Sequence, residues 1–166
     1  MRCQGACLSS AYQDPQDILI TFNILGAEKL ARLRSLAGRV DRLAVTADSA
    51  TTVAGLSGAF ADAERPLEVL VECDTGAGRC GVQSPAEAYD LAAIIAASPG
   101  LRFGGLMTYP AVGGAAAAAA FMRETVEKLA VAGLDCPVVT TGGSPDMASA
   151  APLGVFTEYR AGTYIY

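Results

Sequence analysis

Histidine is absent from this 166-residue chain, and lysine occurs only twice, as Lys29 and Lys128. The absence of histidine excludes the commonest general base, the usual zinc ligand and every nucleophile that an adjacent imidazole activates. Any chemistry must therefore use Asp, Glu, Tyr, Arg or Cys side chains, or a bound cofactor. Both lysines fall among the polar positions of expected surface helices, so neither is predicted to reach a catalytic centre.

Charged residues are also scarce, at 17% of the chain, whereas 52% of the residues are hydrophobic and the formal net charge is −5. This composition argues against disorder, and the scattered Lys and Arg residues argue against a nucleic-acid partner. The apolar runs are shorter than the ~18 residues of a membrane span, and the N-terminus lacks the apolar core of a signal peptide. The length predicts one domain with its own core.

Cysteine occurs five times, an odd number for a chain without a secretory signal, so reduced thiols and a cytoplasmic location are expected. Cys73 and Cys80 are predicted to be small buried packing residues. Cys3 and Cys7 have no second pair at zinc-ribbon spacing, so no metal site is expected there.

Short apolar segments alternate with helical patterns along the chain. Strands are expected at Asp17–Phe22, Arg42–Ala47, Leu67–Cys73, Leu101–Met107, Pro137–Thr141 and Gly154–Tyr159. Helices are expected at Ala27–Ala37, Ala50–Ala61, Pro85–Ala97, Ala115–Ala132 and Ser144–Ala150. Such strand–helix units imply a parallel sheet, either doubly wound or a (β/α) barrel. No GxGxxG follows the first strand, which favours the barrel.

The strand Leu67–Cys73 runs into a glycine-rich turn that carries Asp74 and Arg79. α/β enzymes present charge in this way at the carboxyl end of the sheet. The alternative is an ordinary turn with a surface ion pair between Asp74 and Arg79. On the same strand, Glu68 and Glu72 are predicted to pair with arginines of neighbouring strands rather than to form a carboxylate cluster. Asp48, at the end of its strand, is predicted to cap a helix.

A second glycine-rich turn, TTGGSPD at residues 140–146, follows a strand and precedes a short helix. Ser144 is expected to cap that helix, and the glycines let an anion approach free backbone N–H groups, which indicates a phosphate seat. The alternative is a plain capped helix. This loop and the following loop, residues 160–164, are the last two in the chain, and (β/α) barrels often hold phosphate with their last two loops.

The segments DTGAGRCGV, GLMTYPA, TTGGSPD and TEYRAGTYIY, in this order, resemble the barrel domain of fold-type III pyridoxal-phosphate-dependent enzymes. The resemblance is to the branch of D-threonine aldolase and D-serine dehydratase and, more distantly, to the N-terminal domain of alanine racemase. It covers roughly residues 17–166. It implies that residues 1–166 form a single partial domain, an incomplete TIM-type (β/α) barrel without its first strand and without the family's C-terminal β-domain.

The resemblance also implies roles for individual residues. The cofactor phosphate would be held by Gly142, Gly143, Ser144, Gly162, Thr163 and Tyr164. Arg79 would lie beside the pyridoxal ring or the substrate carboxylate, and Tyr109 near the pyridine nitrogen. Asp74 would orient Arg79, which also gives a buried charge a partner.

Several features depart from the family pattern. The family's Schiff-base lysine lies on the first barrel strand, which matches neither Lys29 nor Lys128, so the catalytic residue stays unknown. Residues 5–9 are interpreted as a remnant of the second strand. The family's metal ligands belong to the β-domain, so a metal ion is not expected in this chain. After Tyr109 the sequence reads Pro-Ala-Val, where the family often has x-Gly-His.

The functional hypothesis is a pyridoxal-phosphate-dependent lyase of D-amino acids, here as an incomplete barrel domain without its lysine. The alternatives are a non-catalytic module that binds pyridoxal phosphate or another phosphorylated ligand, and an inactive truncated fragment. The expected partner is a small amino acid substrate. An open barrel exposes two strand edges, so a homodimer or a missing complementary segment is expected as well.

Overall fold

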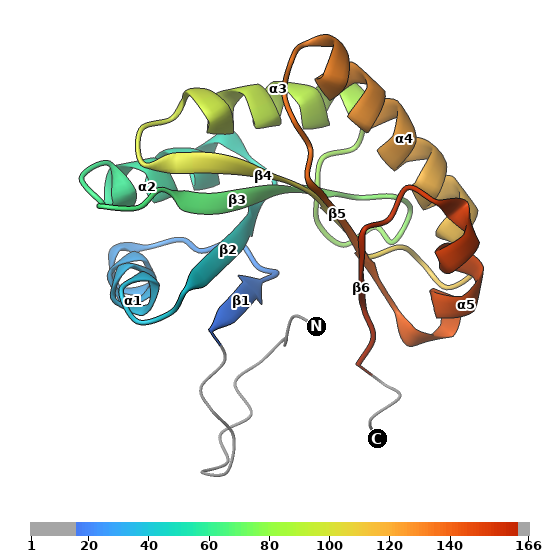
Figure 1. Ribbon diagram of the computed structural model, residues 1–166, viewed down its shortest axis with the longest axis horizontal. Helices are drawn as coiled ribbons and strands as arrows, with labels where there is room; N and C mark the ends of the chain where they lie inside the picture. Colours follow the sequence, from blue (N-terminus) through green and yellow to red (C-terminus); the bar gives the residue numbers. More distant parts are fainter. Residues whose placement is uncertain (1–15, 163–166) are drawn as a thin grey trace.

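The computed structural model describes residues 16–162. Six strands form one parallel sheet in chain order, namely β1 Asp17–Ile20, β2 Arg42–Ala47, β3 Leu67–Cys73, β4 Leu101–Thr108, β5 Val138–Gly142 and β6 Glu158–Arg160. The helices are α1 Ala27–Ala37, α2 Ala50–Phe60, α3 Pro85–Ala97, α4 Ala115–Val131 and α5 Met147–Ala150. The sheet curls, and the helices cover its convex side (Figure 1). The described residues therefore form an open (β/α) half-barrel, which confirms the predicted fold class.

Local sequence signals account for most element boundaries. The Ser84 Oγ accepts a hydrogen bond from the Glu87 N–H (3.2 Å), and the Glu87 carboxylate accepts one from the Gln83 N–H (2.7 Å). Together with proline at its first position, this cap fixes the start of α3 where the sequence predicts it. The prediction that Asp48 caps α2 is wrong, because the capping oxygen belongs to Ser49 and accepts from the Thr52 N–H.

The last part of the fold differs from the prediction. The expected helix Ser144–Ala150 begins as a 3₁₀ turn, Ser144–Asp146, and a second 3₁₀ turn, Ala151–Leu153, follows α5. Gly154 ends that turn with φ 74°, a left-handed conformation that suits glycine. The chain then packs Val155 and Phe156 against the core before β6 begins at Glu158. The expected strand Gly154–Tyr159 is therefore wrong in its first four residues.

Two faces of the sheet bury different side chains. The convex face packs Val45, Val69 and Val71 against α2, α3 and α4 in the main hydrophobic core. In β4, Gly104 and Gly105 have no room for a Cβ atom, because Glu68 and the Val138 backbone lie against them. Close packing at these glycines confirms the sequence prediction for this strand.

The concave face is arranged in layers along the strands. At the amino ends, the buried Glu68 carboxylate binds the guanidinium groups of Arg42 (2.6 Å) and Arg102 (2.8 Å). This confirms the prediction that Glu68 pairs with arginines. A small apolar layer follows, formed by Leu19, Ala44, Leu70, Met107 and Val138. Polar side chains lie beyond it, toward the carboxyl ends, and they belong to the candidate site.

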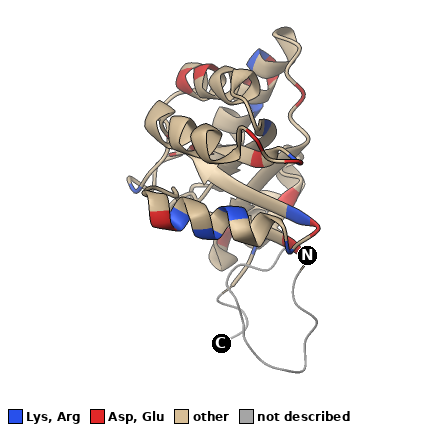
Figure 2. Cartoon of the chain, turned by 90° about the vertical axis from the view of Figure 1, so that its left-hand side faces the viewer, with Lys and Arg blue, Asp and Glu red and all other residues tan. Residues whose placement is uncertain are grey.

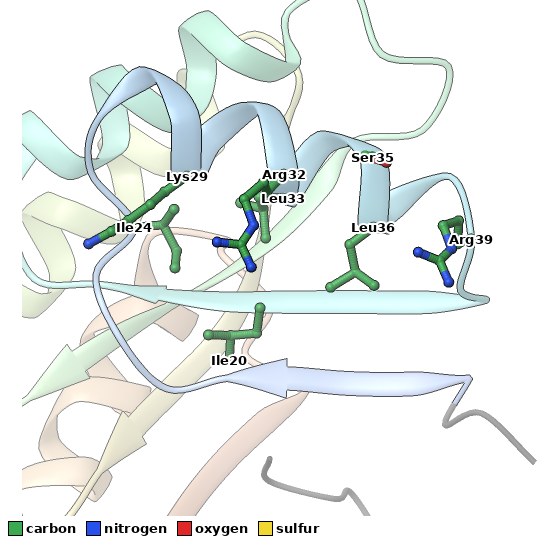
Figure 3. Close-up of a pocket in the computed structure, with 8 residues that line it drawn as sticks. All are labelled: Ile20, Ile24, Lys29, Arg32, Leu33, Ser35, Leu36 and Arg39. Atoms are coloured by element: carbon green, nitrogen blue, oxygen red, sulfur yellow. The ribbon is translucent and has the colours of Figure 1, made fainter. Parts of the chain in front are cut away.

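The two lysines lie on the outer helices. Lys29 of α1 lines a cavity of about 520 Å³ between α1 and β1, with Ile20 and Leu36 among its apolar walls (Figure 3). Lys29 shares α1 with Arg32 and Arg34, and α1 is the helix with several blue segments in the lower front of Figure 2. Lys128 of α4 lies 3.8 Å from the Glu124 carboxylate, and the two residues form an i, i+4 ion pair. No helix among residues 16–162 has the length and apolar character to cross a membrane.

Candidate functional site

Side chains from four consecutive strands converge at the carboxyl end of the half-barrel. The Thr75 and Thr108 hydroxyls are 2.7 Å apart, which joins the loop after β3 to the end of β4. The Asp146 carboxylate accepts hydrogen bonds from the Gly113 N–H at 2.9 and 3.0 Å, which joins the loop after β4 to the loop after β5. The Tyr159 hydroxyl donates to the Gly143 carbonyl at 2.5 Å, which joins β6 to the loop after β5.

Arg79 and Tyr109 lie together in this site. The Arg79 guanidinium carbon is 5.0 Å from the centre of the Tyr109 ring, a cation–π distance. The Tyr109 ring also lies against the backbone of Gly142, where a Cβ atom would be 3.3 Å from the ring. The glycine therefore makes room for the ring, and the structure brings three of the predicted site residues together. Tyr109 keeps 45% of its surface exposed, so the site is open to ligands.

Asp74 organises the turn that carries Arg79. One Asp74 carboxylate oxygen accepts hydrogen bonds from the N–H groups of Gly76 (3.0 Å) and Gly78 (3.1 Å). Burial acts to raise the pKa of Asp74, but these hydrogen bonds and one from Gln83 hold it below its ordinary value. The ion pairs among residues 16–162 do not include one between Asp74 and Arg79, so Asp74 acts on the backbone of the turn.

The loop after β5 has the features that an anion seat requires. Gly143 has φ 104°, which a side chain rarely permits, and among the described residues a Cβ atom there would meet the Tyr109 ring alone, at 4.0 Å. Ser144 does not cap the following turn, so that prediction is wrong. Its Oγ atom is instead buried and has no hydrogen-bond partner within the described part of the chain. A buried hydroxyl without a partner is costly, and a bound anion would satisfy it.

Arg160 is a site residue that the sequence reasoning missed. Its guanidinium donates to the Thr140 hydroxyl at 2.6 Å and to the Thr108 carbonyl at 2.7 Å, and its buried Nε has no partner among the described residues. Burial lowers the pKa of Arg160 to about 10, although the carboxylates of Glu72 and Glu158 oppose the shift. An arginine at the end of the last expected strand was the available signal, because strand ends carry the site in parallel sheets.

The final loop is described only in part. Gly162 is exposed, and its Cβ position is open. The predicted phosphate contacts of Thr163 and Tyr164 lie outside the described residues, as does the interpretation of residues 5–9 as a strand. The role of the final loop in holding an anion therefore stays a prediction.

Glu72 lies on the concave face just below the site and is buried. It accepts hydrogen bonds from the Thr46 hydroxyl (3.2 Å) and the Cys80 thiol (3.0 Å), so the prediction of an arginine hydrogen-bond partner holds for Glu68 and not for Glu72. Cys73 is buried as predicted, but Cys80 is exposed, which contradicts its predicted burial. The next residue, Gly81, packs so closely against the backbone of residues 73 and 74 that a Cβ atom has no room there.

The contact with Glu72 should make Cys80 a slow nucleophile despite its exposure. Burial of the thiol and its hydrogen bond to Glu72 raise the pKa of Cys80 to about 11. We expect iodoacetamide labelling of Cys80 to accelerate about tenfold per pH unit up to that value. Glu72→Gln should accelerate labelling at pH 8, since it removes the negative charge that disfavours the thiolate. Peptide mass spectrometry measures both rates, with Cys136 as the internal reference. Equal Cys80 rates in the two proteins would contradict this assignment.

The described residues contain no group of three or more His, Cys, Asp or Glu side chains that could hold a metal ion. Their donors at the carboxyl end are instead two guanidinium groups, hydroxyls and backbone amides beside glycines. These groups suit an anion with an aromatic portion, because Tyr109 offers a ring face next to the cations.

The fold and the site together define an α/β-barrel domain with a cationic, glycine-rich mouth. Residues 15–166 match the family described as the alanine racemase N-terminal domain, and the chain belongs to that family. D-threonine aldolase from Arthrobacter sp. is 34% identical over 91% of this chain and 42% of its own length. D-threo-3-hydroxyaspartate dehydratase from Delftia sp. is 30% identical over 90% of this chain and 42% of its own length.

A solved structure gives the same answer for the fold. D-threonine aldolase from Filomicrobium marinum superimposes with a TM-score of 0.86 at 32% identity, over 91% of this chain and 44% of that chain. The present chain therefore spans less than half the length of these relatives. The match to the family confirms the resemblance recognised in the four sequence segments.

Proposed function

We propose that this chain is the pyridoxal-phosphate-binding barrel portion of a lyase that acts on D-amino acids. The observation that carries the proposal is the buried Ser144 hydroxyl, which has no hydrogen-bond partner among residues 16–162 and follows Gly143 beside the Tyr109 ring. Pyridoxal phosphate carries a phosphate group and an aromatic ring, and both have a matching surface here. Gly143 and Ser144 would hold the phosphate, with Gly142, Gly162, Thr163 and Tyr164 beside it.

The two arginines supply the positive charge that such a ligand needs. Arg79, stacked on Tyr109, would lie against the ring or the substrate carboxylate, and Tyr109 would lie near the pyridine nitrogen. Arg160, held by Thr108 and Thr140, adds a second cation that cannot swing away. Asp74 would keep Arg79 in place through the hydrogen bonds that order its turn. When bound, pyridoxal phosphate withdraws electrons from the amino acid Cα, and the protein supplies orientation.

The substrate class follows from the relatives. Threonine and 3-hydroxyaspartate, in the names of the relatives, are both amino acids with a hydroxyl group on Cβ. We therefore propose a D-β-hydroxy-α-amino acid as the substrate of the protein to which this barrel portion belongs. A lyase of the D-threonine aldolase or D-serine dehydratase kind fits that substrate class.

A non-catalytic binding module is the second candidate, and the position of the lysines favours it for this chain by itself. Lys29 and Lys128 both belong to helices of the outer layer, and Lys128 has Glu124 as its partner. The described residues would thus hold the cofactor without a covalent bond.

Equilibrium dialysis of the purified chain against pyridoxal phosphate tests the proposal, with pyridoxal, which lacks the phosphate, as the matched ligand. We expect saturable binding of pyridoxal phosphate, competition by inorganic phosphate, and at least tenfold weaker binding of pyridoxal. Borohydride treatment of the complex should leave no covalent label on Lys29 or Lys128. Equal binding of the two ligands would refute the phosphate seat, and a label on either lysine would refute non-covalent retention.

A further inference from the structure

The carbonyl oxygen of the peptide group between Gly143 and Ser144 accepts two hydrogen bonds. The Gly143 carbonyl accepts from the Tyr159 hydroxyl at 2.5 Å and from the Asp146 N–H at 3.1 Å. Tyr159 lies on β6, and Asp146 lies in the turn that follows Ser144. The two donors therefore come from different elements and brace the same oxygen atom.

A fixed carbonyl determines where the neighbouring N–H points. In a planar trans peptide the C=O and N–H bonds point in opposite directions, so the orientation of one sets the other. With the Gly143 oxygen held by Tyr159, the Ser144 N–H lies on the opposite side of the peptide. Gly143 alone cannot impose this orientation, because glycine permits many backbone conformations.

Asp146 stabilises the turn after β5 through contacts that do not involve Tyr159. The Asp146 carboxylate is bound by the Gly113 N–H, and its own N–H binds Gly143, so the turn keeps its shape without Tyr159. Tyr159 adds a second direction of support from the neighbouring strand. Tyr159 is half-buried, and its replacement by phenylalanine removes the hydroxyl alone.

We propose that the Tyr159 hydroxyl positions the Gly143–Ser144 peptide so that the Ser144 N–H and the Ser144 hydroxyl are presented to the phosphate group of the ligand. Tyr159 is thus a positioning residue, which acts through the Gly143 carbonyl and does not itself contact the phosphate. This inference rests on the proposed function and deepens it, since it concerns the same phosphate seat.

Tyr159→Phe is the direct test, because it removes one oxygen atom and leaves the ring. We expect the affinity for pyridoxal phosphate to fall about five- to tenfold, the range for loss of one hydrogen bond, with pyridoxal affinity unchanged within twofold. Tyr89→Phe, on α3 outside the site, is the matched control and should bind both ligands like the wild type. Circular dichroism and the thermal midpoint verify the fold of each variant.

The outcomes distinguish this inference from the proposed function. If the wild type prefers pyridoxal phosphate and Tyr159→Phe binds it equally well, the positioning role is wrong while the phosphate seat stands. An equal loss for both ligands would also overturn the positioning role, because it would indicate a general structural effect. If the wild type does not discriminate between the ligands, the proposed function itself fails. Should Tyr159→Phe not fold, Tyr159→Met provides the same comparison.

Discussion

Gly143→Asp should abolish retention of pyridoxal phosphate, with an affinity loss of at least about 100-fold. The substitution places a carboxylate next to Ser144, at a Cβ position that lies 4.0 Å from the Tyr109 ring. Repulsion between that carboxylate and a phosphate costs several kcal/mol, and the φ of 104° adds strain for any residue with a side chain. Equilibrium dialysis at a fixed protein concentration measures the loss.

Gly133→Asp is the matched control for this experiment. Gly133 ends α4 with φ 73°, has an open Cβ position, and lies outside the candidate site. The two variants therefore share the new charge and a positive φ at the substituted residue but differ in location. Wild-type affinity in Gly133→Asp with loss in Gly143→Asp supports the site. Similar affinity in both variants would show that the loop after β5 does not hold the phosphate.

Arg160→Met should weaken binding of pyridoxal phosphate by about 10- to 100-fold. It removes a guanidinium that is fixed at the mouth of the half-barrel by Thr108 and Thr140. Hydrogen bonds to charged groups contribute roughly 1.5–3 kcal/mol, which corresponds to that range. Arg123→Met is the control, since Arg123 also donates to a backbone carbonyl, that of Leu153, on the outer surface. Unchanged affinity in Arg160→Met would remove Arg160 from the site.

Titration of Arg160 should make the stability of the protein depend on pH, and Arg160→Met serves as the reference protein. Burial lowers the pKa of Arg160 to about 10 in the folded state, below its ordinary value of 12.5. Between these values the unfolded state binds more protons, so this group makes the folded state more stable as pH rises. The free energy of unfolding of the wild type, minus that of Arg160→Met, should therefore increase above pH 10. The slope is at most about 1.4 kcal/mol per pH unit. Urea unfolding at pH 9 and pH 11 measures it, and a constant difference would contradict the assigned burial.

The strands and helices whose boundaries depend on neighbouring residues in the sequence could be predicted from the sequence. Leu67–Cys73 is a run of strand-forming residues buried on both faces, and Ser84, Pro85 and Glu87 define the start of α3. The end of the chain was harder because its strand is only three residues long and is positioned by pairing with β5. Residues 154–157 have an apolar content typical of a strand, but they precede β6, and Val155 and Phe156 pack against the main hydrophobic core instead.

The candidate site also contains residues that local sequence predicts and residues that only distant contacts position. Glycine-rich turns at strand ends predict the positions of Arg79, Gly142 and Gly143, because their conformations depend on local sequence. Arg160 and Tyr159 were missed, since their partners Thr108 and Gly143 are distant in sequence and meet them only through the sheet. The local sequence did not indicate that Ser144 would leave the following turn uncapped. Its hydroxyl, which has no partner among residues 16–162, is nevertheless the observation most useful for function.

The apolar layer on the concave face has a consequence for the chemistry of the mouth. Leu19, Leu70 and their neighbours separate Glu68 and its arginine partners from Glu72 and Arg160, and the separation of four positions from Glu68 to Glu72 along β3 corresponds to about 13 Å. The ion pairs at the base and the cation at the opening thus form two polar layers with an apolar layer between them, and Glu158 acts electrostatically on both Arg42 and Arg160. Because an apolar layer screens charge less than water does, the charge at the base contributes to the potential that a ligand meets at the opening.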